Sequence, residues 1–192
     1  LLPTEEDTYK MLKLTQVVLA KAGYGRYEIS NYAKPGYECR HNIGYWTREN
    51  YLGLGLGAAS LVDNVRYSNT RELDEYTAIC HDLTILPPEA FAPEDGMAAP
   101  ARNWFGSNLH TEASVVSRKS QMEEFMFLGL RMTDGIARDE FAHNFGMPIE
   151  AAYVQVLPEL QAQGLIEKRE GRIYLTDRGM DVANYVMAQF LL

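Results

Sequence analysis

A histidine followed closely by two aromatic side chains is the feature of this sequence best suited to chemistry. His41 precedes Tyr45 and Trp46, and the group comes soon after a Pro-Gly turn at Pro35 and Gly36. Imidazole is a common axial ligand of heme iron, and aromatic rings can stack on a macrocycle or line its pocket. The residue types and their spacing therefore suit a flat, aromatic, metal-bearing ligand.

Alternate glycines follow the histidine block. Gly53, Gly55 and Gly57 are separated by leucines. Because glycine has no Cβ, such a series lets the backbone approach a ligand closely. Close packing of a strand against its neighbours explains the series about equally well, so both interpretations stay open.

The histidine block resembles a motif of the radical-SAM coproporphyrinogen III oxidase family, and within it of the HemW-like branch. The motif is Cys-Arg-His-Asn-x-x-Tyr-Trp, which in this chain comprises Cys39, Arg40, His41, Asn42, Tyr45 and Trp46. The resemblance continues through Tyr67 and Asn69 to the segment 72–83, and it resumes from Glu123 to the C-terminus. Residues 84–118 look unlike the family.

The resemblance implies a heme site and a second site at the mouth of a barrel. The residues implied in heme contact are His41, Asn42, Tyr45 and Trp46, with His41 as the proposed ligand of the iron. The residues implied at S-adenosylmethionine or at the barrel mouth are Gly53, Gly55 and Gly57. The residues expected at the barrel mouth, at the end of the preceding strand, are Glu28, Asn31 and Tyr32. Without the family, a lone histidine in a loop is more often a structural, hydrogen-bonding residue. A Cys39 thiolate is an alternative ligand.

Members of this family hold a [4Fe-4S] cluster with three cysteines in a Cys-x3-Cys-x2-Cys loop, and S-adenosylmethionine binds at the fourth iron. This chain has two cysteines, Cys39 and Cys80, which are too far apart in sequence to supply that loop. We therefore expect the chain to be the C-terminal part of a longer protein and to be unable to make the radical alone.

Two functions follow from the resemblance. The first is binding of heme and its delivery to acceptor proteins. The second is the oxygen-independent oxidative decarboxylation of coproporphyrinogen III to protoporphyrinogen IX. The histidine block favours heme delivery, whereas the family name and the fold alone favour the oxidase. Since one fold hosts many functions, we give the site more weight.

Composition excludes several other classes of protein. A chain of 192 residues with 46% hydrophobic residues fits one or two domains with a sizeable core. No stretch approaches the roughly 18 apolar residues that span a bilayer. Two cysteines give no disulfide framework, which favours the cytoplasm. A net charge of -8 argues against nucleic acid as the main partner.

The elements that would position the histidine block alternate between helix and strand. Apolar residues recur at helical spacing after Thr4, up to Gly23, and again over residues 71–83. Strands are expected over residues 26–32, 51–56 and 60–67. We therefore assign residues 1–83 to an α/β fold, the closing part of a radical-SAM, partial TIM-like barrel.

The rest of the chain divides into an irregular segment and a compact domain. Prolines interrupt residues 84–118, which we interpret as a linker or irregular insertion. Residues 119–192 are predicted to form three helices, of which the second ends at Gly146 and the third, over residues 149–164, is broken at Pro158. A hairpin that turns at Glu170 and Gly171 follows, and this is the order of a mainly α winged-helix-like domain. With seven Lys and Arg against eleven Asp and Glu, this domain is not expected to bind DNA.

Overall fold

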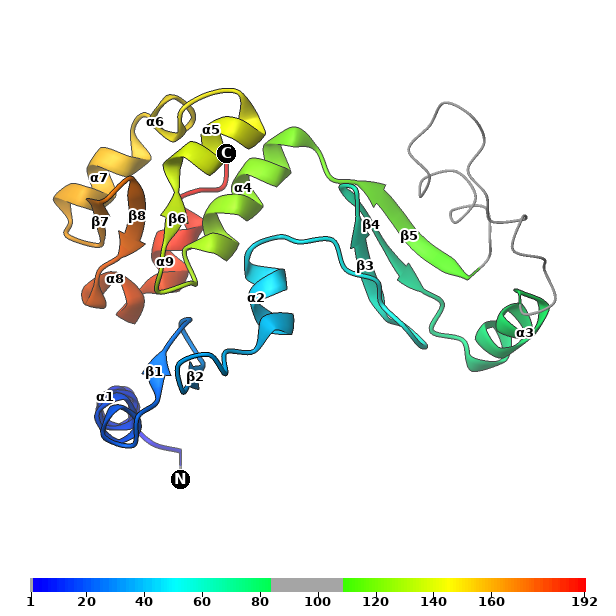
Figure 1. The fold of residues 1–192 in the computed structure, drawn as a ribbon, viewed down its shortest axis with the longest axis horizontal. Helices are drawn as coiled ribbons and strands as arrows, with labels where there is room; N and C mark the ends of the chain where they lie inside the picture. Colours follow the sequence, from blue (N-terminus) through cyan, green and yellow to red (C-terminus); the bar gives the residue numbers. More distant parts are fainter. Residues whose placement is uncertain (1, 84–108) are drawn as a thin grey trace. The chain divides into compact units, whose positions relative to one another are not determined.

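The computed structural model describes residues 2–83 and 109–192 (Figure 1). These residues form two compact units, one of Leu1–Arg48 with Met122–Leu192 and one of Glu49–Gln121. This division differs from the domain boundary expected near residue 83. The cause is backbone pairing between the first segment and the residues after Gly129, where the Ile29 N–H donates to the Arg131 carbonyl at 3.0 Å.

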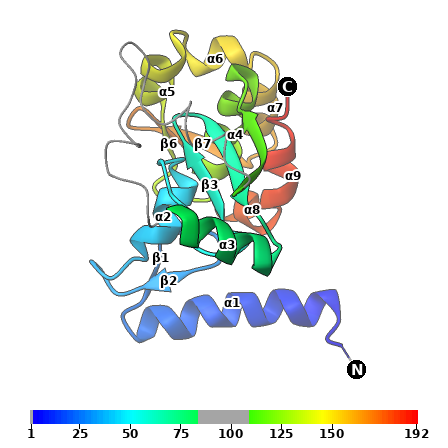
Figure 2. The same ribbon diagram turned by 90° about the vertical axis from the view of Figure 1, so that its right-hand side faces the viewer.

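The first unit begins with helix α1 (Glu5–Lys21), which adjoins strand β1 (Figure 2). Thr4 starts the helix, as expected, because its hydroxyl accepts from the Asp7 N–H at 3.1 Å and the Asp7 carboxylate accepts in return from the Thr4 N–H. Most of the apolar residues at helical spacing are exposed, and α1 buries none of its residues. The helical period was therefore predicted correctly.

The strand expected over residues 26–32 is a small hairpin instead. Strand β1 (Gly25–Arg26) pairs antiparallel with β2 (Tyr32–Ala33). The residues between them turn because the Glu28 carboxylate accepts from the Ser30 N–H at 2.8 Å. Helix α2 (Arg40–Trp46) then occupies the histidine block, where a loop was expected.

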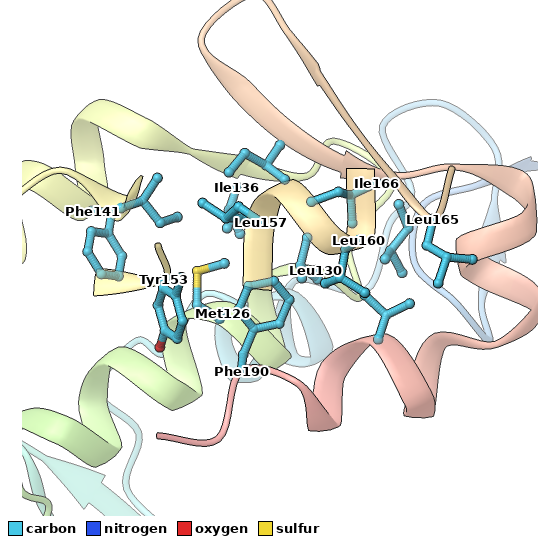
Figure 3. Packing of buried hydrophobic residues seen from close by; sticks show 14 of the residues in the cluster. Met126, Leu130, Ile136, Phe141, Tyr153, Leu157, Leu160, Leu165, Ile166 and Phe190 are labelled. Atoms are coloured by element: carbon cyan, nitrogen blue, oxygen red, sulfur yellow. The ribbon is translucent and has the colours of Figure 1, made fainter. Parts of the chain in front are cut away.

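The C-terminal part of the first unit alternates helices with an antiparallel sheet. Its elements are α4 (Arg118–Gly129), β6 (Ile136–Ala137), α5 (Arg138–Phe145), α6 (Ile149–Ala152), α7 (Val156–Ala162), β7 (Ile166–Arg169), β8 (Arg172–Leu175), α8 (Asp177–Asp181) and α9 (Ala183–Ala188). The strand order in the sheet is β6-β8-β7. Residues from these helices and strands share one core, in which Met126, Phe141, Tyr153 and Phe190 are fully or almost fully buried (Figure 3).

Single glycine and proline residues in the sequence correctly predicted where several of these elements end or turn. Helix α5 ends at Gly146, whose φ of 61° is left-handed. The helix expected from residue 149 to 164 is interrupted and restarts at Val156. This places Pro158 in the first turn of α7, where its missing N–H is not needed. The hairpin β7–β8 turns at Glu170 and Gly171, both with positive φ, as the sequence predicted.

The second unit contains β3 (Ala59–Val62), β4 (Val65–Asn69), α3 (Leu73–Leu83) and β5 (His110–Val115). The strands form an antiparallel sheet in the order β3-β4-β5. The single strand expected over residues 60–67 is the β3–β4 hairpin, because Asp63 and Asn64 take positive φ angles that suit a tight turn. The strand expected over 51–56 is absent apart from one bridge between Tyr51 and Leu61.

The irregular segment expected over residues 84–118 is regular at its described end. Residues 84–108 lie outside the described residues, but β5 and the start of α4 fall within 109–118. The prolines that suggested irregularity all precede this end of the segment. The predicted mixture of helix and strand is confirmed, and every described strand pair is antiparallel. Among the described residues, no helix is both long and apolar enough to cross a membrane.

Thr176 is predicted to stabilise the first unit. Its hydroxyl accepts from the Gly179 N–H at 3.0 Å and donates to the Gly164 carbonyl at 2.8 Å, so it joins the start of α8 to the end of α7. We expect Thr176→Ala to lower the free energy of unfolding by about 1 to 2 kcal/mol, measured by urea denaturation. Thr4→Ala removes a similar cap from α1 and is the matched control. Because α1 buries no residue, the control should change the midpoint less; equal losses would contradict this.

Candidate functional site

Helix α2 divides the histidine block between two faces. His41 and Tyr45 are four residues apart and share one face, where their ring centroids lie 4.8 Å apart at an interplanar angle of 76°. Trp46 follows one residue later, a rotation of about 100° around the helix, on the same side as Asn42. The structure therefore brings His41 and Tyr45 together and directs Trp46 elsewhere.

The two faces differ in their surroundings. The His41 side chain is exposed, whereas Trp46 is half-buried. The Arg131 guanidinium lies over the Trp46 ring, with its central carbon 4.1 Å from the ring centroid. This distance gives a cation–π contact. One face of the Trp46 indole is therefore covered by protein, while the His41 imidazole remains accessible.

Arg131 is in turn held by a buried carboxylate. Glu28 is 0% exposed, and its Oε2 accepts from Arg131 Nη2 at 3.2 Å. Its other oxygen accepts from the Ser30 N–H at 2.8 Å and from Asn31 Nδ2 at 2.7 Å. A carboxylate withdrawn from water requires such partners. Glu28, which was predicted at a barrel mouth, thus holds the arginine that lies over Trp46, and Asn31, predicted at the same mouth, holds Glu28.

A second ion pair fixes the chain directly after α2. Arg48 Nε lies 2.6 Å from Glu124 Oε2, and the two side chains are only 13% and 10% exposed. Glu124 lies in α4, so this pair and the Arg131 contact both tie the C-terminal end of α2 to α4 and the turn that follows it. Tyr32, the remaining residue predicted at the barrel mouth, lies in β2 opposite Arg26.

The Trp46 face of α2 borders an apolar cavity of about 360 Å³. Its lining comes from the end of α2, from α4, α9 and the C-terminal tail, and comprises Trp46, Phe127, Leu128, Arg131, Asn184, Met187, Ala188 and Leu191. Within the described residues, His41 and Tyr45 are not part of this lining. The proposed iron ligand and this cavity therefore belong to different faces of α2.

The glycine series lies in the second unit, where Gly53 is packed against the backbone of residues 58 and 59. A Cβ added to Gly53 would lie 2.2 Å from the Ala59 carbonyl oxygen, so another residue cannot fit without movement of the backbone. Asn69 Nδ2 donates to the Gly53 and Gly55 carbonyls, at 3.2 and 2.8 Å. Close packing therefore accounts for Gly53, and a contact of the series with S-adenosylmethionine stays a prediction.

A histidine outside the predicted site holds Asn69. Because the Asn69 amide nitrogen donates to two carbonyls, its Oδ1 is the acceptor for His110 Nδ1 at 3.1 Å, and Nδ1 carries the hydrogen. The Tyr67 ring contacts the His110 ring at 4.6 Å. Sequence reasoning missed the roles of His110, Asn69 and Arg131, because each partner lies at least 14 residues away and no spacing rule connects them.

The His110 network predicts a pH-dependent stability. Burial lowers the pKa of His110 from its usual 6.5, so the unfolded chain takes up this proton more readily than the folded one. The contribution to stability is complete above about pH 6.5 and is lost as the pH falls below that value. We expect the urea midpoint to drop between about pH 7.5 and 5.5.

His110→Gln should weaken this pH dependence, because an amide can still donate to Asn69 but does not titrate. His143→Gln, a change at an exposed residue, is the matched control and should leave the pH dependence as in the wild type. An identical pH dependence in wild type and His110→Gln would contradict the assignment.

The cysteines do not fit a [4Fe-4S] cluster. Cys39 is exposed at the start of α2 in the first unit, and Cys80 is half-buried in α3 of the second. In the part of the chain that the structure describes, no group of three or more histidine, cysteine, aspartate or glutamate side chains could hold a metal ion.

We expect this chain, after reconstitution with iron and sulfide, to show no [4Fe-4S] absorbance, because it lacks three suitably spaced cysteines. Stoichiometric cluster assembly on the chain would refute this expectation.

Comparison with known proteins tests the family resemblance that the histidine block suggested. Residues 116–182 match the model of the HemN C-terminal domain. The heme chaperone HemW of Escherichia coli (strain K12) is 43% identical over 190 residues, covering 99% of this chain and 44% of that protein. The heme chaperone HemW of Lactococcus lactis subsp. lactis (strain IL1403) is 35% identical over 191 residues, covering 100% of this chain and 44% of that protein.

The chain is related to the HemW-like proteins. The resemblance predicted from the Cys39–Trp46 block is thereby confirmed. A solved structure, the radical SAM enzyme coproporphyrinogen III oxidase (HemN) from Escherichia coli, matches with a TM-score of 0.65 at 16% identity, over 98% of this chain and 42% of that one. This likeness shows a shared fold. The chain spans less than half the length of the HemW-like relatives that it matches.

Proposed function

We propose that this chain is the heme-contacting part of a longer HemW-like protein that binds heme and delivers it to acceptor proteins. The observation that carries the proposal is the accessible imidazole of His41 at the start of α2, with the Tyr45 ring beside it in a nearly perpendicular contact. Heme is here a cargo, so its ligand must be reachable both for loading and for release. An exposed histidine meets this requirement better than a buried one.

The other residues of the block have separate roles in this proposal. Tyr45 lines the heme face beside His41, while Asn42 and Trp46 lie on the neighbouring face of α2. Trp46 can contact a macrocycle only with the parts of its ring that Arg131 does not cover. The Cys39 thiol, exposed at the start of α2, remains an alternative ligand.

In the longer protein we place residues 1–83 in the closing part of a radical-SAM barrel. The exposed apolar side chains of α1 support this, because a helix that normally covers a barrel would leave such a face open when described without it. The relatives and the solved HemN structure imply S-adenosylmethionine and a [4Fe-4S] cluster for the whole protein. The glycine series would lie toward that site.

We further propose that residues 119–192 form a winged-helix-like domain that does not bind DNA. The support is the order α4, β6, α5, α6–α7 and then the hairpin β7–β8, with β6 pairing at the edge of the hairpin. Acidic residues exceed basic ones in this segment, which opposes contact with phosphates. A protein acceptor and a cytoplasmic location fit the composition.

The alternative function is an oxygen-independent coproporphyrinogen III oxidase. The likeness to HemN favours it, but at 16% identity that likeness supports the fold alone. The HemW-like relatives, at 43% and 35% identity over the whole chain, favour heme delivery. Both functions require a porphyrin surface, so the ligand role of His41 is the feature that discriminates between them.

Heme titration tests the proposal. Adding heme to this chain, or to the longer protein, should shift the Soret band. His41→Ala should weaken the complex roughly tenfold or more, about 1.4 kcal/mol, and change the position of the band. The controls are His81→Ala and His143→Ala, which change exposed histidines outside the block. If His41→Ala leaves both the spectrum and the affinity unchanged, His41 is structural and the oxidase becomes the better proposal.

A further inference from the structure

Helix α2 depends on its neighbours for its shape. It has seven residues, buries none of them, and its N-cap residue Cys39 makes no side-chain cap bond in the described structure. Isolated helices of this length are not stable in water. Two described contacts hold its C-terminal end, where Arg131 lies over Trp46 and Arg48 pairs with Glu124.

The Arg131 side chain contacts both Trp46 and Glu28. Its guanidinium presents a flat face to Trp46 at 4.1 Å and an edge to the fully buried Glu28 at 3.2 Å. A lysine could neutralise Glu28 but could not stack on the indole and bridge to the carboxylate with one planar group. The position of Trp46 relative to Glu28 is therefore set by the guanidinium itself.

This arrangement is not optimised for stability alone. The Trp46 Nε1 and Arg131 Nε atoms are buried without a hydrogen-bond partner in the described structure. A buried polar group without a hydrogen-bond partner lowers the stability of the fold. Stability alone therefore does not explain the contact between Arg131 and Trp46. The helix that this contact holds carries His41 five residues before Trp46, about 7.5 Å along the helix axis.

From these observations we infer that Arg131 is a positioning residue for the heme site, acting through Trp46. It holds the C-terminal end of α2, and through the helix it sets the direction of His41 and Tyr45. The inference rests on the proposed function for its effect on heme, but not for its effect on α2. Arg131 touches neither the iron nor its ligand.

The test compares Arg131→Lys with Arg138→Lys in the whole chain. Arg138 forms an exposed ion pair with Glu150 at 2.6 Å in the same unit and is the matched control. Arg131→Lys keeps a cation beside Glu28, and the backbone bonds of residue 131 do not depend on its side chain, so the protein should fold. A melting curve close to that of the wild type verifies this.

In the heme-loaded protein, Arg131→Lys should leave the Soret band where it is in the wild type, because His41 is intact. Transfer of heme to excess apomyoglobin should become roughly threefold to thirtyfold faster, which corresponds to about 0.7 to 2 kcal/mol. Arg138→Lys should transfer heme at the wild-type rate. Equal acceleration by the two changes would overturn the inference.

A double-mutant cycle separates positioning from a general loss of structure. If Arg131 acts through Trp46, then Arg131→Lys should add little to the acceleration already caused by Trp46→Leu. Fully additive effects would show that the two residues act independently and would overturn the inference.

Hydrogen exchange provides a readout without heme. The backbone amides of α2 should exchange faster in Arg131→Lys than in Arg138→Lys or the wild type, while those of α5 should not change. Unchanged exchange in α2 would refute the positioning role. If the wild type shows no Soret shift, the proposed function fails, yet this exchange comparison still decides whether Arg131 holds α2.

Discussion

The first unit depends on one buried charge. Glu28 is withdrawn from water between the strands of a very short hairpin, and a carboxylate in that position is tolerated only with a cation and further donors. Removing the partner of a buried ion commonly costs about 3 to 5 kcal/mol. Because the partner is Arg131, the requirement of Glu28 fixes the turn after α4, and the same guanidinium lies over Trp46.

The histidine block is continuous in sequence but divided in space. A helix places residues four apart on one side, so the eight-residue motif supplies an exposed His41 with a half-buried Tyr45 beside it, and on another side a half-buried anchor, Trp46. His41 is the proposed heme ligand, whereas Trp46 contacts Arg131 at the other side of the helix. One short motif thus supplies both the proposed ligand and a contact that attaches the helix.

Local rules predicted local structure well. The cap at Thr4, the stop at Gly146, the interruption near Pro158 and the turn at Glu170 and Gly171 all follow from the conformational preferences of single residues, and the structure confirms them. The family assignment could also be predicted from the sequence, because it depends on a dense motif.

Contacts between distant residues could not be predicted in this way. The pairing of Glu28 with Arg131 spans 103 positions, and that of Arg48 with Glu124 spans 76. No periodicity relates such residues, so their roles became visible only in the structure. The prediction of a strand over residues 51–56 failed for a related reason, because Gly55 adopts a left-handed angle that Asn69, farther along the chain, helps to hold.

The order of the chain has a consequence for its biosynthesis. The first 48 residues belong to a unit whose remaining residues begin at Met122, with the second unit inserted between them. During translation, the segment that carries His41 must therefore wait until α4 and the residues after it have left the ribosome. The insertion itself adds little to the entropy of closing the loop, since each doubling of its length costs only about 0.6 kcal/mol. Until that closure, Glu28 lacks its partner Arg131, so His41 can take its final position only after Arg131 has been synthesised.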